Sequence, residues 1–229
     1  MTNIRGWVLG VVAAAALSSP AFAVSFFFNG SQGGVPGNGT ADFTINSNNI
    51  VIKLTNTGGP GQVSDIASEL DGIDFTLTGG SAVLNAASLS GLDPNGAVNC
   101  DGVVVCTSVA APASPFGWSL GSGPTFLLAA GGGSFKPDAI VNGNIVGQGG
   151  NGNTSNAQHN PLLLGPVTFT IGFSGTQPTG IGAVDFFFGT SGKALPGSMV
   201  PEPAYYSLLL LGIGAAVVTF RRRKLAAAE

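Results

Sequence analysis

The sequence predicts an all-β protein: a two-layer antiparallel β-sandwich, flanked by an N-terminal signal peptide and a C-terminal transmembrane helix. Two observations predict the sandwich. Apolar and polar residues alternate in several short segments, and turn sequences rich in Gly and Pro separate these segments. A third observation, an apolar run near each end of the chain, predicts the two flanking elements.

The alternating segments are predicted to be strands with one face in the core and the other in water. In residues 167–174, Val167, Phe169 and Ile171 alternate with Thr and Gly. The same pattern recurs at 42–46, 50–55 and 73–78, and Phe-rich first and last strands are predicted at 24–29 and 184–189. Each Phe-rich strand has three successive Phe residues, so at least one ring per triplet points away from the main core. Residues 62–70 are the one segment for which a short helix is expected.

Composition narrows the range of partners. Only 8% of the 229 residues are charged, and 37 are Gly, which fits an extracellular β-rich protein. Between the two ends, residues 24–199 carry three Lys and nine Asp or Glu, a net charge of −6. Such a balance repels phosphate backbones, so we expect no nucleic-acid partner.

The first 23 residues have the features of a signal peptide. Arg5 is followed by an apolar run at residues 6–17, which is too short to span a bilayer. Ala21 and Ala23 form a small-x-small cleavage site after Pro20, so cleavage is predicted after Ala23. An uncleaved anchor is the alternative.

The carboxyl end combines three unlike elements. Pro201, Glu202 and Pro203 hold the chain extended, and residues 204–220 follow without a charge. A helix of this length spans roughly 25 Å, near the lower limit for crossing a membrane. A basic cluster follows this helix and consists of Arg221, Arg222, Arg223 and Lys224. It is predicted to stop translocation and to keep residues 225–229 in the cytoplasm. A permanent single-pass anchor is the simpler alternative.

In this order, the three elements resemble the PEP-CTERM sorting signal. The resemblance covers residues 200–224 and implies a Gram-negative host with a membrane exosortase as the processing partner. It implies that Pro201, Glu202 and Pro203 are the recognised motif, residues 204–220 a temporary membrane anchor, and the basic cluster the stop. We therefore predict a signal peptide at 1–23, a sandwich at 24–190, a linker at 191–200 and a sorting signal at 201–224.

Cys100 and Cys106 are the only cysteines. In an exported protein two cysteines usually pair, and Asp101 and Gly102 allow the chain to turn back between them. We expect a local disulfide. A metal pair or a redox centre is a weaker alternative, because no further ligands lie nearby and the C-x-x-C spacing is absent.

No catalytic residue, metal site or cofactor is predicted. His159, the sole histidine, lies in an Asn- and Gly-rich stretch and is expected to be solvated. Glu69, Asp71 and Asp74 form an acidic cluster in the sequence, for which structural calcium is an alternative to simple exposure of the carboxylates.

These observations favour a non-enzymatic surface or matrix protein associated with exopolysaccharide or biofilm, transiently anchored and then released to the cell surface. A carbohydrate- or ice-binding sandwich is the first alternative, and it predicts a flat row of exposed Thr or aromatic residues. A secreted hydrolase is the second alternative, and it predicts a deep pocket lined by paired acids or placed around His159.

Overall fold

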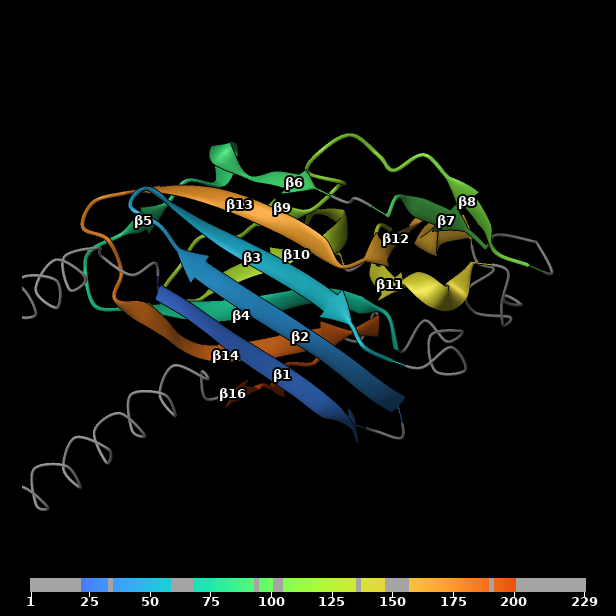
Figure 1. Ribbon diagram of the computed structural model, residues 1–229, viewed down its shortest axis with the longest axis horizontal. Helices are drawn as coiled ribbons and strands as arrows, with labels where there is room; N and C mark the ends of the chain where they lie inside the picture. The colour runs from blue at the N-terminus through green and yellow to red at the C-terminus, as the bar shows by residue number, and fades with distance from the viewer. Residues whose placement is uncertain are drawn as a thin grey trace, which may run out of the picture.

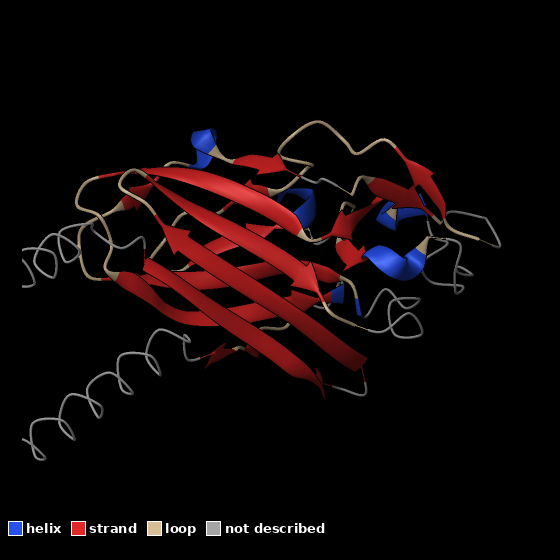
Figure 2. Ribbon diagram, in the orientation of Figure 1, coloured by secondary structure: helices blue, strands red, loops and turns tan. Residues whose placement is uncertain are grey.

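Strands dominate the computed structural model, which describes residues 22–32, 35–58, 68–92, 95–100, 105–134, 137–146, 157–189 and 192–200. Across these ranges the chain forms strands and short 3₁₀ turns and no α-helix (Figure 2). The 3₁₀ turns that lie wholly within these ranges are η2 (Ala86–Ser88), η3 (Ala130–Gly133), η4 (Gly143–Ile145) and η5 (Ala157–His159). None of the described helical segments is long and apolar enough to cross a membrane.

The strands form two sheets, here called sheet A and sheet B. Sheet A has the order β16 (Ser198–Val200), β1 (Phe22–Gln32), β2 (Val35–Ile45), β3 (Asn49–Asn56), β13 (Val167–Ser174) and β5 (Val83–Leu84), with β6 (Ser90–Leu92) also paired to β13. Sheet B has the order β15 (Leu195–Pro196), β14 (Gly180–Phe188), β4 (Leu70–Thr78), β11 (Ile140–Asn142), β12 (Leu162–Gly165), β7 (Ala97–Asn99) and β8 (Thr107–Val109). Two further strands, β10 (Phe126–Ala129) and β9 (Ser119–Leu120), extend from β4.

The two sheets stack as layers, with β1, β2, β3 and β13 in front of β4, β10 and β14 (Figure 1). The predicted sandwich is therefore confirmed at the level of two packed β-layers. One pairing departs from the antiparallel prediction, because β11 and β12 run parallel. The predicted signal peptide, apart from Phe22 and Ala23, and the predicted membrane helix lie outside the described residues.

The core forms between the layers because alternate residues of each strand face inward. In β3 every second residue is buried, as the sequence alternation predicts. The rings of Phe43 in sheet A and Phe75 in sheet B meet across the layers with centroids 5.3 Å apart. Among the Phe triplets, Phe27 is 40% exposed and Phe187 is buried outside the main core cluster, so one ring of each triplet does leave that cluster.

A second, smaller apolar cluster surrounds the two cysteines. Cys100 and Cys106 form the predicted disulfide, and both are buried. The backbone N–H of Cys100 donates to the side-chain oxygen of Asn160 at 2.8 Å, which joins this loop to the segment before β12. The disulfide thus fixes the β7–β8 end of sheet B.

Candidate functional site

The segment that leads into the C-terminal motif is held firmly by the folded body. Leu195 pairs with Phe186 in sheet B and is buried in the core. Gly197 donates its N–H to the carbonyl of Val184 at 2.8 Å, and a Cβ at Gly197 would lie only 2.7 Å from the Phe186 ring. Gly is therefore required here for close packing against the ring.

After Gly197 the chain changes sheets. β16 pairs antiparallel with β1, with Ser198 opposite Phe27 and Val200 opposite Ser25. Residues 195–200 thus run from the edge of sheet B to the edge of sheet A, and Pro201 follows at once. β1 also begins the described body, so the predicted signal peptide and the segment after β16 both adjoin this edge of the sandwich.

This arrangement differs from the linker predicted for residues 191–200, of which residue 191 lies outside the described chain. Pro196 and Gly197 lie within the predicted linker. In the structure Pro196 is exposed in a sheet-edge strand, where a missing N–H is tolerated, and Gly197 allows a close contact. Leu195 anchors the segment because its side chain is apolar and finds space in the core.

The amino end of the body lies on the same edge. Ala23, half of the predicted cleavage site, is exposed in β1 opposite Thr44, and Ala21 lies outside the described residues. Val24 is the first buried side chain, at 5% exposure. Cleavage after Ala23 would therefore leave every core residue of β1 in place, although the cleavage itself stays a prediction.

Comparison with protein families identifies the segment that begins at the end of β16. Residues 200–224 match the family model described as the PEP-CTERM protein-sorting motif. The chain carries a PEP-CTERM sorting motif. The match confirms the resemblance to this signal, and the motif implies export, sorting to the cell surface and processing by an exosortase. Neither a search of the curated proteins nor a search of the solved structures found a match to the chain.

The sorting motif begins at the last residue of β16, Val200, and its remaining residues lie outside the described chain. These include Pro201, Glu202 and Pro203 and the basic cluster of Arg221, Arg222, Arg223 and Lys224. Their roles in recognition and in stopping translocation stay predictions. What the structure adds is the position of the motif's first residue, fixed by strand pairing at the edge of sheet A.

His159 is the main correction among the predicted sites. It lies at the end of η5 and is only 6% exposed, contrary to the expected solvated histidine. Its Nδ1 is 3.9 Å from Oε2 of Glu69, which is fully buried. No local pattern indicates this contact, because the two residues lie 90 positions apart in the sequence.

Asp71 joins this buried group through a β-bulge. Gly72 pairs with Phe187 and Leu70 with Phe188, so Asp71 is an extra residue in β4. Burial, and secondarily the carboxylate of Glu69, raises the pKa of Asp71 well above its usual value, and the backbone N–H of Gly189 offsets only part of this rise. Since these carboxylates are fully buried, the group is suited to joining β4 to η5 rather than to meeting a substrate from solvent.

Asp74 is separated from the other two acids of the predicted cluster. It lies on β4 directly opposite Asp185 of β14 and is partly buried. Burial, and secondarily the Asp185 carboxylate, raises the pKa of Asp74. Within the described ranges, no group of three or more His, Cys, Asp or Glu side chains is placed to hold a metal ion.

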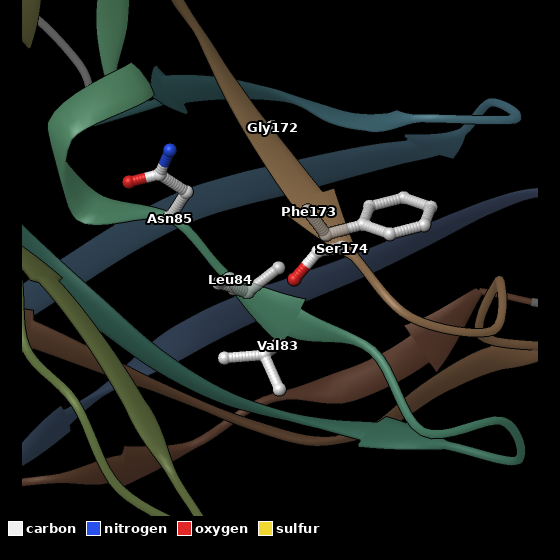
Figure 3. Close-up of a pocket in the computed structure, with 6 residues that line it drawn as sticks. All are labelled: Val83, Leu84, Asn85, Gly172, Phe173 and Ser174. Atoms are coloured by element: carbon white, nitrogen blue, oxygen red, sulfur yellow. The ribbon is translucent and has the colours of Figure 1, made fainter.

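A pocket of about 360 Å³ lies at the edge of sheet A between β5 and β13 (Figure 3). Its lining carries no titratable side chain, so it offers no acid or base for hydrolysis; it consists of Val83, Leu84, Asn85, Gly172, Phe173 and Ser174. The pocket is not one of the sites that the hydrolase alternative predicts.

The outer face of sheet A carries aligned hydroxyl groups. Thr40 of β2 lies opposite Thr55 of β3. In a second row, Val51 of β3 lies between Thr44 of β2 and Thr170 of β13. At the centre of the face, Asp42 and Lys53 lie opposite each other, so the two charges balance. Such a row is not visible in any one strand, because it depends on the register between neighbouring strands.

Proposed function

We propose that this protein is a non-enzymatic component of the extracellular matrix that an exosortase processes at its C-terminal motif and that then associates with exopolysaccharide. The observation that carries the proposal is the PEP-CTERM sorting motif, which begins at the end of β16. Export and surface sorting follow from the motif itself; the lack of catalysis, the polysaccharide association and the role in biofilm are the proposed part.

The geometry of the body supports this role in two ways. β1 and β16 lie side by side, so the predicted leader and the sorting motif both adjoin one edge of the sandwich, which is consistent with a body that extends away from the membrane. Asp71 and Asp138, two carboxylates whose pKa burial raises, have buried side chains and do not line the pocket at β5. Perturbed groups at an active site would line a cleft.

The decisive test replaces Pro201, Glu202 and Pro203 by Ala and follows the chain in its host by cell fractionation and mass. We expect the variant to stay in the membrane fraction at full tail length, while the wild type loses its tail and reaches the surface. A matched control replaces Pro112 and Pro124, two loop prolines of the body, by Ala. Normal processing of the motif variant would contradict the proposal.

A second function, carbohydrate or ice binding, is favoured by the aligned Thr side chains of sheet A. Hydroxyl groups in register on a face whose Asp42 and Lys53 charges balance fit a neutral, hydroxyl-rich ligand. Replacing Thr44 and Thr170 by Lys should abolish retention on a polysaccharide gel or thermal hysteresis, whichever the wild type shows. The same changes at Thr107 and Thr125, which are exposed elsewhere, should have no effect.

A further inference from the structure

Strand β1 leaves part of its backbone edge uncovered. It pairs with β2 over its full length, Phe22–Gln32, without any shift of register. On its other side β16 covers only residues 25–27 (Figure 1). In the described chain no further strand pairs with residues 28–32 on this side, so alternate N–H and C=O groups there point outward.

The other sheet ends are protected in the usual way. The terminal strands β5, β8, β15 and β16 are two or three residues long, and β15 contains Pro196. Short strands, prolines, charges and bulges are the devices by which proteins prevent edge pairing. β1 has none of them, since it is 11 residues long and contains neither charge nor proline.

The Phe28 ring packs this part of β1 against the core. The Phe28 ring packs against Phe186 and Phe188 of sheet B, with centroids 6.5 and 5.8 Å away. The same ring lies over Gly30, where its Cζ is 3.1 Å from the position a Cβ would take. A strand held in this way is pre-organised as a template, which lowers the entropic cost of adding another strand.

The last described strand, β16, runs away from this edge. It is antiparallel to β1, with Ser198 opposite Phe27 and Val200 opposite Ser25, so its direction at Val200 is away from Phe28. The residues before Ser198 pair with β14 in sheet B instead. Neither described segment at the carboxyl end pairs with residues 28–32 of β1.

We propose that residues 28–32 of β1 pair antiparallel with the same residues of a second copy of this chain, which joins two sandwiches through a continuous sheet A. Antiparallel pairing of identical strands is self-complementary. With Gly30 at the two-fold axis, Asn29 lies opposite Ser31 of the second copy, and no like charges meet. A short edge contact of this kind gives a weak association, which the high local concentration of a surface layer favours.

Hydrogen exchange tests the pairing on the full chain in detergent, over about 1 µM to 1 mM protein. The amides of residues 28–32 should exchange more slowly as the concentration rises, while those of the buried strand β4 do not change. Exchange at residues 28–32 that is independent of concentration would overturn the proposal, and this result does not depend on any variant.

A charge variant identifies the surface. Asn29→Lys with Ser31→Lys places four cations across the proposed axis and should weaken association about tenfold or abolish it, as measured by light scattering. The matched control, Asn48→Lys with Ser122→Lys, adds the same charge at exposed positions between strands and should associate like the wild type. Equal association of all three proteins would place the contact elsewhere, for example in the predicted membrane helix, and would refute the β1 edge.

Discussion

Asp138 gives a prediction whose magnitude follows from its burial. The residue is 6% exposed, its Oδ1 has no hydrogen-bond partner among the described residues, and burial raises the pKa of its carboxyl from 3.8 to about 6. The folded state therefore holds the proton more tightly than the unfolded state. The resulting stabilisation is complete below about pH 3.8 and is lost as the pH rises through 6.

Replacement of Asp138 by Asn removes the ionisation. A shift of this size corresponds to at most about 3 kcal/mol of unfolding free energy, and partial solvent screening reduces the expected gain to about 1–2 kcal/mol at pH 7.5. At pH 4 the gain should vanish, because the wild-type carboxyl is then protonated when folded. Asn is the appropriate choice because the φ of Asp138 is 70°, a left-handed conformation that Asn tolerates better than Ala does.

Trp118 provides the assay. It is the only tryptophan outside the predicted leader, and its Nε1–H donates to the carbonyl of Asp138 at 2.8 Å. Urea unfolding of the exported protein, followed by Trp118 fluorescence at both pH values, measures the difference. Asp42→Asn removes the same charge from a partly exposed side chain and is the control. A stability difference between wild type and Asp138→Asn that is the same at pH 4 and pH 7.5 would refute the burial argument.

Two further predictions concern the C-terminal segment of the body, residues 195–200, and the disulfide. Gly197→Val forces the Phe186 ring aside and should destabilise the fold by about 1–3 kcal/mol, with faster hydrogen exchange at residues 195–200. Ala194→Val, at an exposed position, should change neither the stability nor the exchange. Unchanged exchange in Gly197→Val would contradict the tight packing of this segment. Replacing Cys100 and Cys106 by Ser opens a seven-residue loop and should lower the unfolding free energy by about 2.4 kcal/mol, as measured by the same urea assay. Reduction of the wild type should reproduce that loss, and an unchanged urea midpoint would argue against a stabilising crosslink.

The position of β16 has a consequence for processing. Pro201 follows a residue that is fixed opposite Ser25, so the folded body sits directly beside the sorting motif. The three residues of β16 are exposed and form only a short pairing. Opening such a strand costs far less than unfolding the sandwich, so β16 can detach from β1 while the body stays folded.

The sequence by itself determined the features that depend on neighbouring residues. Alternation of apolar and polar residues predicted the long strands, because a strand exposes its two faces with period two. The disulfide joins cysteines six positions apart, and the sorting motif is a continuous run at residues 200–224. Such local patterns need no knowledge of how distant segments meet.

Only the tertiary structure decided the features that join distant residues. Sheet order and register decide three such features: the contact of His159 with Glu69, the pairing of Ser198 with Phe27, and the row in which Val51 lies between Thr44 and Thr170. A three-residue strand such as β16 has too few positions to show a period. The sequence alone does not show whether Gly197 serves a turn or a close contact with a neighbouring ring. The folded sandwich brings these residues together because burial of its apolar faces fixes which strands are neighbours.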